Sequence, residues 1–99
     1  MSLPVDWLDD AVNDLDRILD YIELESPRGA LAIALSIRGQ ADSLLGDNPR
    51  IGRAGRIKGT RELVVARTPY IVIYKVTIRR VQILRILHGA QQWPPRSGA

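Results

Sequence analysis

The sequence predicts an α+β fold with the element order β-α-α-β-β-β, in which an antiparallel helix hairpin packs on one face of a mainly antiparallel sheet. In the first half of the chain, apolar residues recur every three or four positions, as they do along one side of a helix. The second half instead contains three short apolar runs separated by turn residues, which is typical of neighbouring strands. Ninety-nine residues suffice for one core, so we expect a single domain over residues 1–95 and a flexible tail over residues 96–99.

The N-terminal segment predicts a short strand followed by a helix. Leu3–Trp7 is a candidate edge strand, because Pro4 lacks the N–H that an inner strand would donate. From Leu8 to Ile22 the apolar residues form one stripe at helical spacing. Asp9 and Asp10 lie in the first turn, where negative charge is favourable because it meets the positive end of the helix dipole.

A second helix is predicted to start at Ser26. This residue is a natural N-cap, and Pro27 follows it at the first helical position, which proline tolerates. Gly46 fits the C-terminal end of this helix. Because the joint between the two helices is short, they should form an antiparallel hairpin.

The second half of the chain predicts a loop and then three strands. Asp47–Gly59 has neither helical nor strand periodicity and is rich in glycine and basic residues, so we expect an irregular loop. The strands that follow should form an antiparallel meander because their connections are short. Their expected bounds are Arg61–Ala66, Tyr70–Thr77 and Arg80–Leu87.

The last strand contains a charged residue in an apolar row. Strict alternation would place Val81, Ile83, Arg85 and Leu87 on one face. An unpaired buried charge is costly, so Arg85 should either pair with an acidic residue of a helix or lie where the sheet is open to a ligand. Alternation also places Arg61 and Glu62 on opposite faces of their strand, so no pair between them is expected.

Several classes of protein are excluded by composition. There is no cysteine, and one histidine gives a metal ion too few nitrogen ligands, so we expect neither thiol chemistry nor a metal site nor a cofactor. No apolar run approaches the roughly 20 residues that a membrane-spanning helix needs, and the N-terminus lacks the pattern of a signal peptide. We therefore expect a cytoplasmic protein without membrane contact.

Charge is divided sharply along the chain. Residues 1–49 contain ten acidic and three basic residues, whereas residues 50–99 contain eleven basic residues and one acidic residue. This division suggests a positive surface for an anionic partner, either nucleic acid or an acidic protein segment. The alternative is that the basic half neutralises the acidic half within the fold.

Short motifs are spread over almost the whole chain. They are Trp7, Asp14-Leu15, Ile18–Ile22, Asn48–Arg53, Gly59–Leu63, Pro69–Tyr74, Ile83–Arg85 and His88-Gly89. In these residues and in their order the chain resembles the ParE/RelE superfamily of toxins from type II toxin–antitoxin systems, and is closer to ParE.

The resemblance implies a partner and two candidate targets. The partner is a cognate antitoxin, ParD-like and of the ribbon-helix-helix type, through which alone the toxin would reach operator DNA. ParE-like members inhibit DNA gyrase and need no catalytic set. RelE-like members cut mRNA on the ribosome and use, among other groups, an arginine early in the third strand, whereas this chain has Ile71 there. We therefore expect inhibition of DNA gyrase, and hence of replication, and keep mRNA cleavage as the alternative. A third alternative is a non-toxic member that acts only in an autoregulatory complex.

Site residues follow from these alternatives. If the chain is a ribonuclease, His88 would transfer a proton while Arg85 and Arg61 stabilise charge. For target binding we predict Arg61, Arg67, Arg85, His88 and Trp93. His88 and Trp93 also have structural alternatives, as a strand-end residue with a satisfied ring and as a plug over the core edge.

Antitoxin binding is expected on the helix hairpin and the basic loop. An amphipathic antitoxin helix should lie in a groove along the hairpin. The residues we predict to bind it are Leu15, Leu19, Ile22, Arg53, Arg56 and Lys58.

Overall fold

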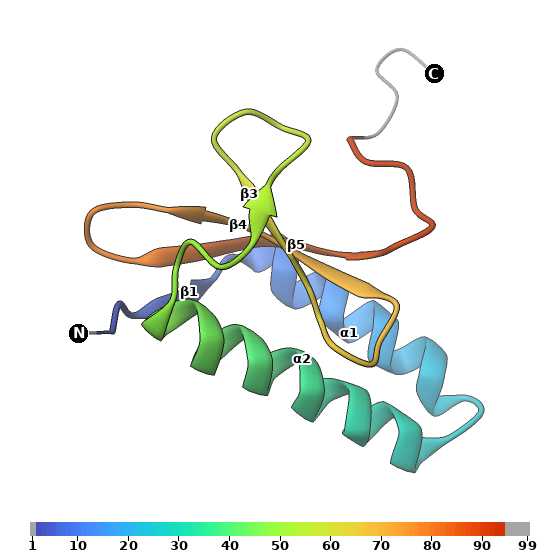
Figure 1. The fold of residues 1–99 in the computed structure, drawn as a ribbon. Coiled ribbons are helices and arrows are strands. Elements are labelled where there is room, and N and C mark those ends of the chain that lie inside the picture. The colour runs from blue at the N-terminus through green and yellow to red at the C-terminus, as the bar shows by residue number, and fades with distance from the viewer. Residues whose placement is uncertain (1, 95–99) are drawn as a thin grey trace.

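The computed structural model describes residues 2–94 as two helices packed on one face of a five-stranded mixed sheet (Figure 1). The elements are β1 (Val5–Trp7), α1 (Asp9–Glu23), α2 (Pro27–Asp47), β2 (Arg53–Ala54), β3 (Arg61–Val64), β4 (Tyr70–Val76) and β5 (Val81–His88). The predicted α+β fold and helix hairpin are confirmed. The predicted tail lies outside the described residues, and within them no helix is long and apolar enough to cross a membrane.

Strand order in the sheet is β1-β5-β4-β3-β2. β3, β4 and β5 form the predicted antiparallel meander, and β1 pairs in parallel with the first three residues of β5. The last strand of the sequence therefore lies between β1 and β4, and it joins the N-terminal strand to the rest of the sheet.

The second helix begins as predicted and ends later than predicted. Ser26 caps it, since its Oγ accepts a hydrogen bond from the N–H of Gly29 at 2.9 Å. The helix continues to Asp47, so the prediction that Gly46 ends it is wrong. Gly46 lies instead at a close approach: a Cβ there would lie 3.1 Å from the carbonyl oxygen of Leu3, whose N–H donates to the Gly46 carbonyl at 2.8 Å.

The predicted loop between Asp47 and Gly59 contains a strand, β2, that sequence periodicity did not indicate. Its two residues are too few to show alternation, and they pair with β3. The chain approaches the sheet closely at Gly52, whose N–H donates to the hydroxyl of Tyr74 in β4 at 2.9 Å. A Cβ on Gly52 would lie 2.6 Å from that hydroxyl oxygen, so this position requires glycine for packing.

A β-bulge in β5 reverses the predicted alternation. Ile83 and Arg85 pair with consecutive residues of β4, so Leu84 between them has no partner there. Val81 and Ile83 belong to the core under the helices, whereas Leu87 belongs to an apolar cluster on the opposite face. The prediction that all four residues of the Val81–Leu87 row share one face is therefore wrong: Arg85 and Leu87 lie across the sheet from the first two.

Two apolar clusters result, one on each face of the sheet. The larger lies between the helices and the sheet and includes Tyr70 and Tyr74, as predicted. The smaller consists of Ile71, Ile73 and Leu87, with Leu84 and Trp93 packed against it. We call the sheet surface that bears this second cluster the open face, because neither helix covers it.

Candidate functional site

Trp93 packs on the open face. The segment that follows β5 brings the half-buried indole onto the apolar cluster there, and the guanidinium carbon of Arg85 lies 5.5 Å from the ring centroid. The indole Nε1 is buried and has no hydrogen-bond partner among residues 2–94. This placement agrees with the structural alternative of a plug, and a role in target binding stays a prediction.

Arg85 pairs with an acidic residue of α1. Asp14 accepts hydrogen bonds from Arg85 Nε at 2.6 Å and Nη2 at 3.1 Å, and from the backbone N–H of Ile86 at 3.0 Å. β1 covers only the first part of β5, so this carboxylate satisfies a donor on the strand edge that β1 leaves uncovered. The hydrogen bonds that Arg85 donates to Asp14 raise the pKa of Arg85, which therefore stays charged. Of the two alternatives for Arg85, the structure shows pairing with a helix acid.

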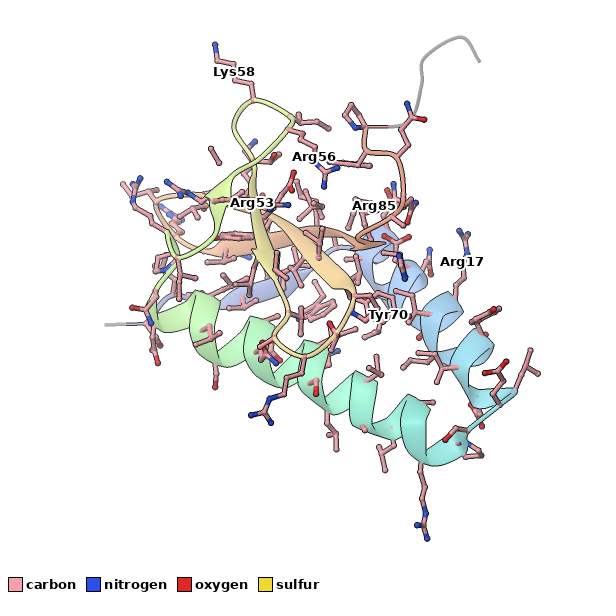
Figure 2. The ribbon with its side chains drawn as sticks, turned by 45° about the vertical axis from the view of Figure 1, so that its right-hand side comes forward. Arg17, Arg53, Arg56, Lys58, Tyr70 and Arg85 are labelled. Carbon is pink, nitrogen blue, oxygen red and sulfur yellow. The ribbon has the colours of Figure 1, made fainter. Side chains whose placement is uncertain are left out.

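Glu62 binds two arginines, Arg53 and Arg56, of the chain between residues 52 and 59, which contains β2 and which we call the β2 segment. It is 1% exposed, and it accepts hydrogen bonds from Arg53 Nη2 at 3.0 Å, from Arg56 Nε and Nη2 at 3.1 Å each, and from the backbone N–H of Arg56 at 2.9 Å. The side-chain hydrogen bonds from Arg56 are the main reason that the pKa of Glu62 falls from 4.5 to about 2, against the opposing effect of burial. Lys58, by contrast, extends away from the loop tip (Figure 2). Two of the three basic residues predicted to bind the antitoxin are therefore already paired.

Arg61 is held by backbone carbonyls. Its Nη1 donates to the carbonyl of Gly52 at 2.8 Å and to that of Arg50 at 3.2 Å. As predicted, it forms no pair with Glu62 within the described part of the chain.

His88 and Arg67 lie at the other end of the meander. His88 is exposed at the end of β5, its Nδ1 accepts a hydrogen bond from the N–H of Ala90 at 3.1 Å, and its ring meets that of Tyr70 edge-on with centroids 5.6 Å apart. The turn that contains Arg67, which has a φ of 65°, is tied to the same place, because Pro69 accepts a hydrogen bond from the N–H of Gly89 at 2.7 Å. His88 is thus a strand-end residue whose ring accepts a hydrogen bond, which is the structural alternative to a role in target binding.

The residues proposed for a ribonuclease site do not come together. His88 pairs with Tyr70 of β4 and Arg61 with Tyr74, four residues or about 13 Å further along that strand. Arg61 also lies on the helix side of the sheet, whereas Arg85 is on the open face. Within residues 2–94 there is also no group of three residues that could hold a metal ion.

A groove lies between the two helices of the hairpin, near their connection. It measures about 250 Å³ and is lined by Leu19, Glu23, Pro27, Ala30, Leu31 and Ala34. Of the residues predicted to bind an antitoxin here, Leu19 lines the groove, Ile22 is half-buried against the core, and Leu15 is 6% exposed within it. Sequence reasoning missed Leu31, which is 61% exposed, because a leucine outside the main stripe of a helix has no periodic signal.

Comparisons with known proteins agree on one family. The model of the family described as "ParE toxin of type II toxin-antitoxin system, parDE" matches residues 5–93. The chain is 46% identical over 88 residues to the putative toxin Y4kP of Sinorhizobium fredii, covering 89% of this chain and 90% of that protein. It is 41% identical over 85 residues to toxin RelE2 of Caulobacter vibrioides, covering 86% and 93%.

Two solved structures are similar along most of their length. One is the chromosomal ParDE system from P. aeruginosa, with a TM-score of 0.78 and 32% identity over 88% of this chain and 96% of that one. The other is the toxin–antitoxin complex RelBE2 from Mycobacterium tuberculosis, with a TM-score of 0.62 and 25% identity over 92% and 95%.

Proposed function

The chain belongs to the ParE toxin family of type II toxin–antitoxin systems, and on this premise we propose that it inhibits DNA gyrase by binding it and is neutralised by a ParD-like antitoxin. Binding would block replication without any bond being made or broken by this chain. The observation that supports a binding protein over a ribonuclease is the chemistry of the open face.

RNA cleavage needs free cations and a proton-transfer group within reach of one phosphate. The centre of the open face is instead apolar, with Ile71, Ile73 and Leu87 all at most 7% exposed. The arginines beside it are bound to acids: Arg85 to Asp14, and the two arginines of the β2 segment to Glu62. Arginines paired in this way are less available to a phosphate, which favours a binding protein over a ribonuclease.

Antitoxin binding is supported by the groove on the helix hairpin. Its floor is apolar and Glu23 lies at its edge, which suits an amphipathic helix that brings apolar anchors and at least one basic residue. The similar solved structures are toxin–antitoxin systems, which supports a partner of this kind. Lys58 at the loop tip remains the best placed of the three predicted basic contacts, because it extends into solvent (Figure 2).

A gyrase supercoiling assay tests the proposal. The purified chain should inhibit supercoiling of relaxed plasmid in proportion to its concentration, and prior mixing with the antitoxin encoded beside it should restore activity. A variant with His88→Ala should still inhibit gyrase, because no proton transfer is involved, and its affinity should fall only by the one predicted contact of His88 with the target. Full gyrase activity at a large molar excess of folded chain would refute gyrase as the target.

Cleavage of mRNA on the ribosome is the second candidate, favoured by the similarity to proteins named RelE2 and RelBE2. It is tested by mapping transcript ends after the chain is induced without antitoxin. New ends that disappear in the His88→Ala variant would support this candidate over gyrase. Unchanged transcript ends in arrested cells would exclude it.

A further inference from the structure

We propose that the pocket beside Arg61 is a binding site for a carboxylate group of a protein partner. The pocket measures about 280 Å³ and lies where the β2 segment meets β3 and the end of β4. Its lining residues are Arg50, Ala54, Gly59, Thr60, Arg61 and Val76. Two of these are arginines and none is acidic.

Arg61 is fixed in place but keeps free donors. Both of its backbone acceptors, the carbonyls of Arg50 and Gly52, bind the same nitrogen, Nη1. The edge formed by Nε and Nη2 has no hydrogen-bond partner among residues 2–94. A guanidinium whose orientation is already set loses little side-chain entropy when this edge binds a ligand.

The same edge binds a carboxylate elsewhere in the molecule. Arg85 holds Asp14 through Nε and Nη2, and Arg56 holds Glu62 through the same two nitrogens. These two pairs are bidentate, the strongest geometry for an arginine and a carboxylate. In Arg61 the edge formed by Nε and Nη2 is unoccupied, because no acidic residue among residues 2–94 pairs with it.

The surroundings of Arg61 favour an anion. Arg61 is half-buried, so part of its hydration is lost, and no carboxylate within the described residues lies close enough to form an ion pair with it. Arg50 lines the same pocket and is exposed, which adds a second positive charge at the rim. The hydroxyl of Thr60 donates to the carbonyl of Ile57 at 2.6 Å, so it is not available to donate to a ligand.

A carboxylate and a phosphate both suit a guanidinium edge. We assign a carboxylate, from an acidic side chain or a chain terminus, because the proposed function gives this chain protein partners; this choice alone rests on that function. The existence of the anion site rests on the geometry of Arg61, so the site and the proposed function can fail separately.

Titration of the full-length chain with sodium acetate, followed by NMR of the arginine Nε–H groups, tests the site. The Arg61 signal should shift and saturate at millimolar acetate. Signals of Arg56 and Arg85 should move much less, because their edges are already bound to carboxylates, and they serve as internal controls. A linear shift of all arginine signals without saturation would overturn the proposal.

A parallel titration with inorganic phosphate at the same ionic strength separates the two anions. Comparable or weaker binding of phosphate than of acetate supports a carboxylate site, whereas about tenfold tighter binding of phosphate would overturn that assignment.

Two variants locate the site, with the backbone N–H signals of Gly59 and Thr60 as the readout. Arg61→Gln should weaken acetate binding about tenfold or more, as expected when a charge-assisted bidentate pair is lost. Arg50→Gln keeps the anchored guanidinium and should weaken it only about two- to threefold. Equal affinity in Arg61→Gln and the unmodified chain, with both folded, would show that Arg61 is not the binding group.

Discussion

Replacing Glu62 by glutamine removes a buried negative charge while keeping the shape of the side chain. In the native protein this carboxylate, 1% exposed, accepts hydrogen bonds from Arg53 and from both the side chain and the backbone of Arg56. The substitution leaves both guanidinium groups without a counter-ion. We therefore expect Glu62→Gln to lower the free energy of unfolding and to loosen the β2 segment.

The size of the effect follows from the pKa of Glu62. A pKa lowered from 4.5 to about 2 corresponds to about 3 kcal/mol of native-state stabilisation at neutral pH, at about 1.4 kcal/mol for each pH unit. The side chains of Arg53 and Arg56 are 57% and 40% exposed, and solvent screening weakens their attraction, so we expect a loss of about 2 kcal/mol.

The stabilisation by Glu62 should depend on pH in a definite direction. Because folding lowers the pKa of Glu62, its stabilisation is fully present above about pH 5 and is lost as the pH falls towards 2. The difference in unfolding free energy between the unmodified chain and Glu62→Gln should therefore be about 2 kcal/mol at pH 7 and should shrink steadily towards pH 2.

Urea unfolding followed by the fluorescence of the two tryptophans measures this difference at several pH values. Glu23→Gln, at an exposed position near the end of α1, is the matched control and should change the unfolding free energy by less than about 0.5 kcal/mol. A difference for Glu62→Gln that stays constant from pH 7 to pH 2, or that is no larger than the control's, would refute the reasoning.

Three further substitutions test other parts of the fold by the same unfolding measurement. Asp14→Asn should lose about 3 kcal/mol, because Arg85 is then half-buried without its counter-ion, whereas Asp16→Asn on the exposed side of α1 should be neutral; equal losses would contradict this. Gly52→Ala should lose about 1 to 3 kcal/mol from the close approach to Tyr74, while Gly39→Ala, whose added Cβ meets nothing within 4 Å, should be neutral or stabilising. Trp93→Phe should lose no more than about 2 kcal/mol, since the buried indole N–H that it removes has no hydrogen-bond partner among residues 2–94, and a larger loss would contradict this.

Local patterns were sufficient to predict most elements of this fold. Helix starts depend on a few adjacent residues, and the Ser26-Pro27 pair indicates its helix unambiguously because capping acts within one turn. The meander followed from apolar runs and short connections. The β-bulge at Leu84 could not be predicted, because a single extra residue in one strand leaves no mark in the composition of the other.

Contacts between distant residues decided what the candidate site can do. The sequence left open whether Arg85 pairs with a helix acid, because its partner Asp14 is 71 residues away. The role of Glu62 was missed for a different reason: its arginine partners are near in sequence, but they lie in a segment whose strand, only two residues long, has no periodic signal. Arg61 was singled out as a basic residue, but its free bidentate edge becomes visible only when its two carbonyl acceptors are known.

The position of β5 in the sheet bears on how the chain folds during synthesis. β5 is the last strand to be translated, yet β1, β4 and α1 all pack against it. Until Val81–His88 is available, β1 has no neighbour to pair with and Asp14 has no cationic partner, so the contacts that link the two ends of the chain must form late. A nascent chain that lacks β5 therefore cannot assemble this sheet, and the two faces of the sheet exist only once Val81–His88 has been translated.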